Sequence, residues 1–225
     1  MDLFRKIKAG VGFLRSAPTR YHLWYYRHRV WDTTYWVGVK ALKSPSDMWN
    51  YQEILSSLKP SLVIEFGTCY GGSALFFAAV MRQIGHRFKL LSVDIDPSNI
   101  SEMTRQDPAI ELLTMSSTDA RVAERIAVLR RQYPGPVFVI LDSDHSDAHV
   151  LTEMKSIRPL LVSGDYVVVE DSNVNGHPVY TDHGPGPFEA MNKYFEQYPD
   201  DYKHDDARES KFGFSFATRG FLIRR

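Results

Sequence analysis

The sequence predicts one α/β domain with a doubly wound, mostly parallel sheet of the Rossmann-like type. From residue 50 onward, short β-branched apolar runs alternate with segments of helical character, the pattern of repeated strand–helix–strand units. Polar residues follow these runs at the position where ligands of open parallel sheets bind. The 225 residues suffice for one full core, and a hydrophobic content of 44% is ordinary for a globular domain.

The elements of this domain are predicted in order along the chain. The buried strands are expected at Leu62–Phe66, Lys89–Val93, Ile110–Thr114, Val137–Leu141 and Tyr166–Glu170. The helices are expected at Ser73–Gln83, Pro97–Arg105, Thr118–Arg131, His149–Leu161 and Glu189–Gln197. Gly213–Thr218 and Gly220–Arg225 are expected to close the sheet as an antiparallel pair. The domain spans residues 44–225, and residues 1–43 form an N-terminal extension.

The extension is basic and aromatic. Nine Lys or Arg residues and two Asp residues give residues 1–43 a formal charge of +7, although the whole chain is neutral. Its aromatic residues are Phe4, Phe13, Tyr21, Trp24, Tyr25, Tyr26, Trp31, Tyr35 and Trp36. One interpretation is a helical arm that contacts a membrane surface or an acidic or glycosylated substrate. We favour packing on the domain or on a second copy in a homo-oligomer. No basic groove continues downstream, so we expect no nucleic-acid partner.

Cysteine content and hydropathy predict a cytoplasmic protein. Cys69 is the single cysteine, which excludes an internal disulfide and fits a reducing compartment. The chain has no run of about 18 apolar residues that would suggest a spanning helix. Its first 20 residues lack the apolar core and cleavage site of a secretory signal.

A glycine-rich turn follows the first predicted strand, in the segment Glu-Phe-Gly-Thr-Cys-Tyr-Gly-Gly-Ser-Ala from residue 65. Glycines between a strand and a helix let the backbone approach a ligand closely, and the helix N-terminus offers free N–H groups. The spacing is not the dinucleotide GxGxxG, and no Gly-Lys-Ser/Thr of a P-loop follows. NAD and ATP are therefore disfavoured, and the candidate binding residues at this turn are Glu65, Gly67, Gly71 and Ser73.

The next two strand ends carry residues suited to a nucleoside. Asp94 lies 27 residues after Gly67, about one strand–helix–strand step, where a carboxylate accepts hydrogen bonds from both ribose hydroxyls. Asp96 is assigned to capping the helix expected from Pro97. Ser117 is placed beside an adenine edge, although Ser117 or Thr118 is equally suited to cap the following helix.

Acidic residues after the fourth and fifth strands predict a metal site. Asp142 and Asp144 follow the fourth strand, and Glu170 and Asp171 end the fifth. Carboxylates gathered in one cleft repel one another unless a cation neutralises them. Oxygen ligands without a cysteine cluster select Mg²⁺ or Ca²⁺ over zinc. Mg²⁺ is favoured because it accepts a few carboxylates and leaves positions for water and substrate oxygens. The alternative is a set of solvated acidic loops, which the apolar strands before them make less natural.

A histidine beside these acids is the candidate proton acceptor. His145 lies three residues after Asp142, near enough to take a proton from a hydroxyl at the metal site. The alternatives are a structural histidine, a role that also suits His149, or a metal ligand. The Pro/Gly-rich segment 173–188 is predicted as a substrate wall or lid. Its candidate contacts are His177, Asp182 and His183.

Together these motifs resemble the cephalosporin hydroxylase family, which includes rhamnosyl O-methyltransferases. The resemblance covers about residues 44–225 and is carried by Asp47 with Tyr51–Leu55, by Val63–Thr68 with Gly71–Ala74, by Leu141–His145, and by Val169–Asp171 with Asn173–Pro178. The sequence is similar, more distantly, to macrolide-sugar and catechol O-methyltransferases.

The resemblance implies a fold that binds S-adenosylmethionine (SAM), with Mg²⁺ at Asp142, Glu170 and Asp171 and with His145 as the base. Asp144 is the competitor of Asp142 as first metal ligand, and Asp142 is also expected beside the cofactor. The implied reaction is methyl transfer to a hydroxyl of a sugar or small natural product. The family name implies a metal-dependent hydroxylase as the alternative, and a non-catalytic SAM-binding protein is a third hypothesis.

Overall fold

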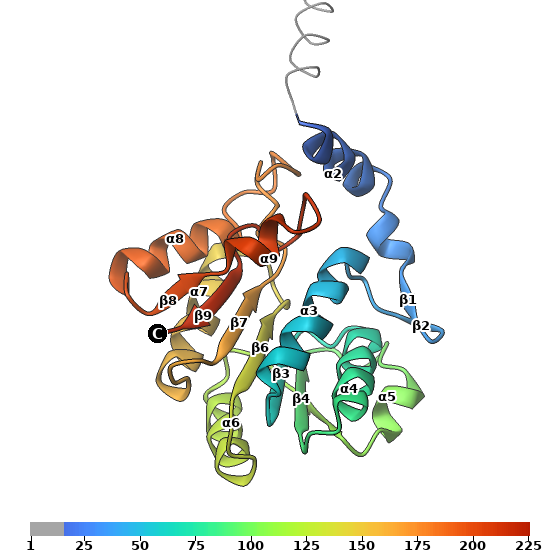
Figure 1. The fold of residues 1–225 in the computed structure, drawn as a ribbon, viewed down its shortest axis with the longest axis vertical. Coiled ribbons are helices and arrows are strands. Elements are labelled where there is room, and N and C mark those ends of the chain that lie inside the picture. Colours follow the sequence, from blue (N-terminus) through green and yellow to red (C-terminus); the bar gives the residue numbers. More distant parts are fainter. Residues whose placement is uncertain (1–15) are drawn as a thin grey trace, which may run out of the picture.

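The computed structural model describes residues 16–225, and its centre is a seven-stranded sheet in the order β5-β4-β3-β6-β7-β9-β8 (Figure 1). The strands are β3 (Leu62–Phe66), β4 (Lys89–Asp94), β5 (Ile110–Thr114), β6 (Val137–Leu141), β7 (Tyr166–Val169), β8 (Tyr202–His204) and β9 (Phe221–Arg224). The first five are parallel, while β9 pairs antiparallel with both β7 and β8. The predicted doubly wound sheet with a closing antiparallel pair is confirmed, and its switch point lies between β3 and β6.

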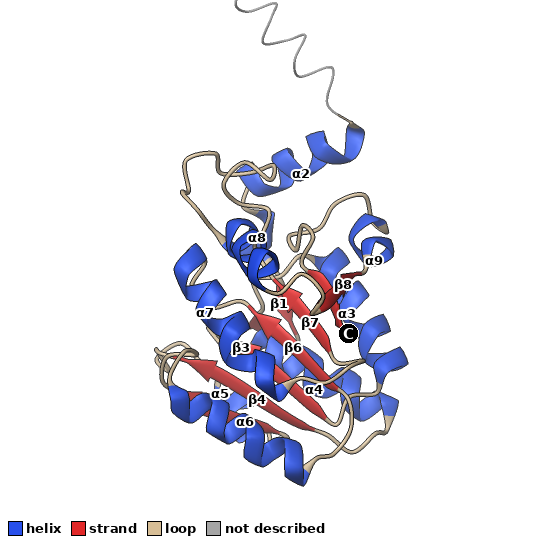
Figure 2. Ribbon diagram, turned by 90° about the vertical axis from the view of Figure 1, so that its left-hand side faces the viewer, coloured by secondary structure: helices blue, strands red, loops and turns tan. Residues whose placement is uncertain are grey.

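Helices cover both faces of the sheet (Figure 2). They are α2 (Ala17–Arg27), α3 (Pro45–Leu58), α4 (Gly72–Ile84), α5 (Glu102–Gln106), α6 (Ala120–Gln132), α7 (Asp147–Ile157), α8 (Pro187–Gln197) and α9 (Asp206–Ser210). Short elements connect them: η1 (Val30–Thr33), a hairpin of β1 (Tyr35–Trp36) and β2 (Val39–Lys40), and η2 (Arg158–Leu160). Apolar residues of α6, α7 and α8 form one core cluster with the sheet, and those of α3 and α4 form the other.

The central strand shows why the apolar runs are continuous. Successive side chains of a strand point to opposite faces, so Leu62, Ile64 and Phe66 belong to the cluster under α6–α8 and Val63 to the cluster under α3 and α4. All four side chains are fully buried. A parallel strand that is covered on both faces has no solvent-exposed side. Its sequence is therefore a continuous run of apolar residues without alternating polar ones.

The C-terminal pairing differs from the prediction in one strand. The segment Gly213–Thr218 is not a strand, and β9 pairs instead with β8. The alternating aromatic residues of that segment pack on the extension, where Phe214 lies 5.7 Å and Phe216 5.9 Å from the ring of Tyr25. An alternating pattern identifies a face that is buried, and here α2 rather than a second sheet layer buries it.

The predicted helix Pro97–Arg105 is also shorter than expected. It begins at Glu102 as α5, with Ser101 as its N-cap. Asp96 does not cap this helix, because its Oδ1 accepts a hydrogen bond of 2.9 Å from the backbone N–H of Ser98 and closes a local turn. An aspartate before a proline fits both arrangements, since Asx turns and helix caps use the same side-chain acceptor.

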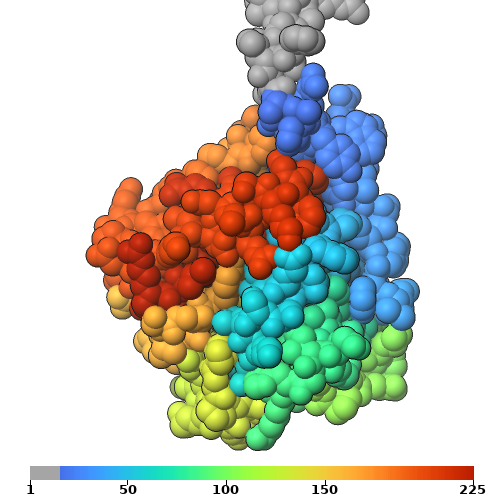
Figure 3. All heavy atoms as spheres, in the orientation of Figure 1, coloured from blue at the N-terminus to red at the C-terminus, as the bar shows by residue number. Residues whose placement is uncertain are grey.

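The extension lies against the C-terminal part of the domain, as the contact of blue and red atoms in Figure 3 shows. His22 and Tyr25 of α2 are buried, and they pack with Phe214 and Phe216. The packing of the extension on the domain is therefore seen for α2, whereas Phe4 and Phe13 lie outside the described residues. None of the helices between residues 16 and 225 is both long and apolar enough to cross a membrane.

The buried His22 makes this packing sensitive to acid. Burial lowers the pKa of His22 to about 4 from its usual 6.5, so the unfolded chain binds its proton first as the pH falls. Stability from this site is therefore complete above pH 6.5 and declines between pH 6.5 and 4. We expect the free energy of unfolding to fall by about 2 kcal/mol more between pH 7 and 5 in the wild type than in His22→Gln. Urea unfolding at both pH values measures this, and equal losses would contradict it.

Candidate active site

A cavity of about 900 Å³ opens at the carboxyl ends of the parallel strands. Its walls come from the segments that follow β3, β4, β5, β6 and β7 and from two covering pieces, the extension and the loop after β7. The lining includes Gly67, Asp94, Ser117, Asp142, His145 and Asp171 on the strand side, and Tyr26, Trp31, Tyr180 and His183 on the covering side. Most of the predicted site residues thus meet in one cavity, whereas Glu65, Gly71 and Glu170 are not among its lining residues.

The glycine-rich turn is fixed by two close backbone approaches. At Gly67, φ is +97°, and a Cβ there would overlap the backbone carbonyl of Asp142, because β3 and β6 are neighbours. At Gly71, φ is +84°, and a Cβ would overlap the side chain of Thr104. Both positions therefore require glycine. The turn leaves Ser73, in the first turn of α4, on the cavity wall.

Glu65 lies beneath this turn. Its carboxylate is fully buried and accepts hydrogen bonds from the hydroxyls of Ser73 (2.5 Å) and Ser92 (2.6 Å). Burial raises the pKa of Glu65 to about 7, an effect that the positive charge of Lys43 opposes. Glu65 therefore ties β3, β4 and the start of α4 together, and it acts on any ligand over the turn through Ser73.

Asp94 links the end of β4 to the same turn. Its Oδ2 accepts a hydrogen bond of 2.7 Å from the N–H of Cys69, and its Oδ1 accepts one of 2.9 Å from the N–H of Asp96. Asp94 lines the cavity. A carboxylate held by backbone donors at the end of the second strand is suited to accept hydrogen bonds from vicinal ribose hydroxyls.

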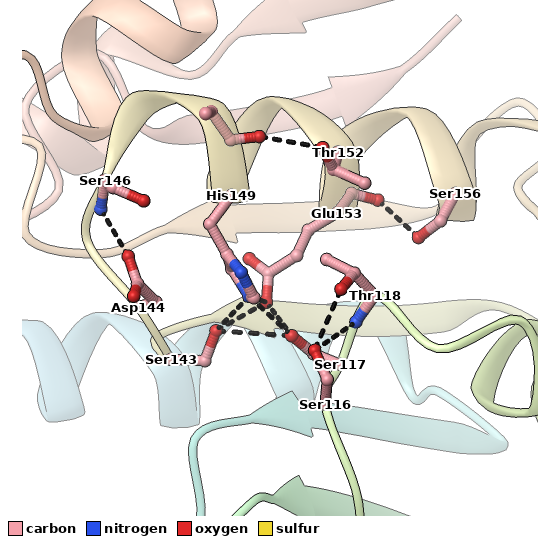
Figure 4. Close-up of polar contacts among 11 residues, drawn as sticks. Ser116, Ser117, Thr118, Ser143, Asp144, Ser146, His149, Thr152, Glu153 and Ser156 are labelled. Carbon is pink, nitrogen blue, oxygen red and sulfur yellow. Dashed lines mark hydrogen bonds and ion pairs between the residues drawn. The ribbon is translucent and has the colours of Figure 1, made fainter.

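Ser117 belongs to a polar network rather than to a helix cap (Figure 4). Its hydroxyl donates to Glu153 Oε1 at 2.5 Å and lies 2.9 Å from His149 Nε2, and the hydroxyl of Ser143 donates to the same carboxylate at 2.6 Å. The cap of α6 is Asp119, neither Ser117 nor Thr118. His149 is held by this network, and its hydrogen bond with Glu153 raises the pKa of His149. Ser117, Ser143 and His149 all line the cavity.

The acids after β6 and β7 lie close together because these strands are neighbours. The N–H of Glu170 donates to the carbonyl of Leu141 at 3.0 Å, which places Glu170 beside Asp142. Burial is the main cause that raises the pKa of Asp142, Glu170 and Asp171 above the usual range. Crowded carboxylates that resist ionisation are the donor set expected for a hard divalent cation. Asp142 and Asp171, which line the cavity and group with His145, fit Mg²⁺, whereas the predicted ligand Glu170 lies outside this group and outside the cavity lining.

His145 faces this group of acids. Its Nε2 lies 3.2 Å from Asp171 Oδ2, and Asp142, His145 and Asp171 each present one possible ligand atom within 4.8 Å of the others. Burial lowers the pKa of His145, but the charges of Asp171 and Asp142 outweigh it, and the pKa is raised. Asp144 also lines the cavity but lies outside this group, and it accepts a hydrogen bond of 2.7 Å from the N–H of Ser146 at the start of α7.

Two buried groups of this site were missed by the sequence analysis. The Lys43 ammonium binds Asp142 Oδ2 and lies 3.2 Å from Glu170 Oε1, and the Tyr51 hydroxyl donates to Glu170 Oε1 at 2.5 Å. Lys43 had been counted among the basic residues of the extension. Tyr51 had contributed to the family resemblance without a role. A signal was available in α3, where Asp47 and Tyr51 are one turn apart and share a buried face.

The loop after β7 contributes different residues from those predicted. Tyr180 and His183 line the cavity. His177 instead contacts Glu189 Oε1 at 2.9 Å and stacks on Phe188, so it holds the loop to α8. Asp182 accepts a hydrogen bond from the hydroxyl of its neighbour Thr181. Of the three predicted contacts, the structure places His183 at the cavity.

The strand order, the glycine turn and the acid at the end of β4 define the fold as that of a SAM-dependent methyltransferase. The chain belongs to the rhamnosyl O-methyltransferase/CmcI family, whose model matches residues 28–225. The match begins before residue 44, so it includes the segment with Lys43 that the sequence comparison had left outside the resemblance.

Curated relatives and solved structures agree with this assignment. The rhamnosyl O-methyltransferase of Mycobacterium leprae (strain TN) is 59% identical over 230 residues and covers 100% of both chains. That of Mycobacterium tuberculosis (strain H37Rv) is 58% identical over 209 residues, 93% of this chain and 85% of the relative. The chain is therefore a SAM-dependent O-methyltransferase.

Two structures of CmcI share the fold. The D160 form with Mg and SAM has a TM-score of 0.69 at 24% identity over 86% of this chain and 77% of that chain. The N160 form with S-adenosylhomocysteine has a TM-score of 0.66 at 22% identity over 86% and 84%. At these identities the likeness concerns the arrangement of the elements.

Proposed function

We propose that this enzyme transfers the methyl group of SAM to a hydroxyl of a rhamnosyl acceptor, with Mg²⁺ held by Asp142, Glu170 and Asp171. The observation that carries the proposal is that Asp94, Asp142 and Asp171 line one cavity. The rhamnosyl acceptor rests on the names of relatives at 58% and 59% identity. Methyl transfer to purified rhamnosyl acceptors from labelled SAM, with and without a chelator, tests it.

The cofactor lies over the glycine turn in this proposal. Asp94 accepts hydrogen bonds from the ribose hydroxyls, and Ser117 lies beside the adenine. Gly67 and Gly71 let the cofactor approach the backbone, and Ser73 places a polar group at the start of α4. Asp142 and His145, at the other side of the same cavity, would then face the methyl group of the bound cofactor.

The Asp94 assignment predicts a change in cofactor affinity. We expect Asp94→Ala to raise the Kd of SAM by about a hundredfold, because two charge-assisted hydrogen bonds are lost. Asp96→Ala is the matched control, since Asp96 is exposed, lies two residues away and closes a local turn. Calorimetric titration with SAM measures both. Equal Kd values for the two variants would contradict the ribose assignment.

The reaction needs a proton acceptor and an oriented hydroxyl. Mg²⁺, when bound, lowers the proton affinity of the acceptor hydroxyl and restricts its position. His145 Nε2 takes the hydroxyl proton as the oxygen–methyl bond forms and the methyl–sulfur bond breaks, which leaves a methyl ether and S-adenosylhomocysteine. The walls of the cavity hold the two reactants in line. Iron content in the purified enzyme would instead favour the hydroxylase alternative.

Aromatic side chains of the extension and the loop form the covering wall. Tyr26 and Trp31 come from the extension and Tyr180 from the loop, and the rings of Tyr26 and Tyr180 meet at 5.1 Å. Aromatic faces pack well on the apolar faces of sugar rings, with polar groups fixing the orientation. We place the acceptor sugar against this wall, between the extension and the acids.

This placement predicts an effect on acceptor binding. Trp31→Ala is expected to raise the KM for the acceptor about tenfold, because apolar contact with the sugar is lost. The Kd of SAM should stay within about twofold of wild type. Trp49→Ala is the control, because Trp49 is 58% exposed on α3 and does not line the cavity. An unchanged KM for the acceptor in Trp31→Ala would contradict the placement of the sugar against this wall.

We further propose that the enzyme is a cytoplasmic homo-oligomer that associates through the extension. The rings of Tyr21 and Trp24 on α2 stack on each other while each stays about half exposed. Exposed stacked aromatics support contact with a second copy. Light scattering tests the association. Sedimentation with anionic vesicles tests the alternative, peripheral contact with a membrane surface.

A further inference from the structure

A lysine side chain is buried among the acids of the active site. Lys43 directly precedes Ser44, the N-cap of α3, and its side chain is 2% exposed. Its ammonium binds Asp142 Oδ2 and lies 3.2 Å from Glu170 Oε1. A fully buried lysine is stable only if its charge is compensated. Lys43 is therefore a fixed positive charge at the junction of β6 and β7.

The negative charges of the carboxylates around Lys43 explain why positive charge is needed at this place. Glu170 is buried beside Lys43, while the side chains of Asp142 and Asp171 are 21% and 23% exposed. Partial removal of three neighbouring carboxylates from water is costly unless positive charge accompanies them. Burial lowers the pKa of Lys43, but the charges of Asp142, Glu170 and Glu65 outweigh it and raise the pKa, so the ammonium stays charged. One positive charge compensates part of the cluster, and a divalent cation would compensate the rest.

The contacts divide the oxygens of the cluster into two sets. Lys43 binds Oδ2 of Asp142, and both Lys43 and Tyr51 contact Oε1 of Glu170. Oδ1 of Asp142 and Oε2 of Glu170 take no part in these contacts. The ammonium thus orients the two carboxylates through one oxygen each, and of the two only Asp142 also belongs to the group of possible ligand atoms with His145 and Asp171.

We propose that Lys43 is the resident counter-cation of this carboxylate cluster and sets its affinity for Mg²⁺. The ammonium keeps Asp142 and Glu170 together in the metal-free enzyme, and it repels the metal that joins the same carboxylates. Mg²⁺ binding is therefore weaker and more readily reversed than the carboxylates alone would make it. This inference rests on the magnesium site of the proposed function.

Titration of the full-length enzyme with MgCl₂ alone, without SAM or acceptor, tests the inference. Replacing Lys43 by glutamine removes one positive charge close to the metal, so we expect the Kd of Mg²⁺ in Lys43→Gln to fall by at least about tenfold. The metal-free Tm should fall, and the rise in Tm on saturation with Mg²⁺ should exceed that of wild type. Lys43→Arg keeps the charge, and its Kd should stay within about threefold of wild type. An unchanged or higher Kd in Lys43→Gln overturns the inference.

A second measurement covers the case in which Lys43→Gln does not fold. In wild-type enzyme with ¹⁵N-labelled lysine, the ammonium resonance of Lys43 is identified as the protected signal that is absent from Lys43→Arg. This resonance is expected to shift on addition of MgCl₂. A resonance that does not respond to a saturating metal overturns the inference while leaving the metal site intact. Absence of Mg²⁺ binding by the wild type would instead contradict the magnesium site itself.

Discussion

Asp142→Asn is expected to lower kcat for methyl transfer by about a thousandfold or more and to abolish Mg²⁺ binding measured by titration. Asp142 is the acid that joins the parts of the site, because its carboxylate binds Lys43 and lies within ligand distance of His145 and Asp171. An amide of the same shape removes one negative charge from the cluster, and the metal contribution to the barrier, several kcal/mol, is lost with it. The Kd of SAM should change by less than about fivefold, because Asp94 and the glycine turn are untouched.

Asp144→Asn is the matched control for this prediction. Asp144 lies two residues away, accepts a hydrogen bond from Ser146 N–H, and stands outside the group that Asp142 forms with His145 and Asp171. We expect this control to keep kcat and the Kd of Mg²⁺ within about threefold of wild type. A large loss of kcat and of Mg²⁺ affinity in Asp144→Asn, with both unchanged in Asp142→Asn, would show that Asp144 rather than Asp142 is the metal ligand.

The sheet could be predicted from the sequence because its signals are local. Strands such as Leu62–Phe66 and Val137–Leu141 are continuous apolar runs that end at polar residues, and the structure gives them the predicted bounds. Parallel strands end at one edge of the sheet, so Gly67, Asp94 and Asp142 could be placed together before any coordinates. What fixes these positions is short-range pattern combined with one topological rule.

The parts that were missed depend on contacts between distant segments. The pairing of β8 with β9 could not be read from Gly213–Thr218, because the alternation of Phe214 and Phe216 records burial by α2 from the other end of the chain. Lys43 gave no local signal either. A lysine in a basic segment reads as exposed, and its burial follows from acids about 100 and 127 residues away in sequence. A charge that is compensated by residues distant in sequence cannot be predicted from the periodicity of apolar residues.

His145→Gln is expected to lower kcat by about a hundredfold to ten-thousandfold, the usual contribution of a positioned general base. In the wild type, the rate should rise with pH through the pKa of His145, because the neutral imidazole accepts the hydroxyl proton. The charges of Asp171 and Asp142 favour the protonated form, so this limb should lie above the ordinary histidine value of 6.5 wherever those charges remain uncompensated. His145→Gln should lack the limb.

The same variant decides between a base and a metal ligand for His145, since its Nε2 lies 3.2 Å from Asp171 Oδ2 and within the group of possible ligand atoms. A base predicts that His145→Gln keeps the Kd of Mg²⁺ within about threefold while kcat falls. A ligand predicts that Mg²⁺ binding weakens by tenfold or more, as removal of a coordinating group usually requires. His204→Gln, which replaces a half-buried histidine on β8 outside the cavity, controls for loss of any imidazole. Metal affinity and rate that fall together would show that His145 holds the ion, and the proton would then need another acceptor.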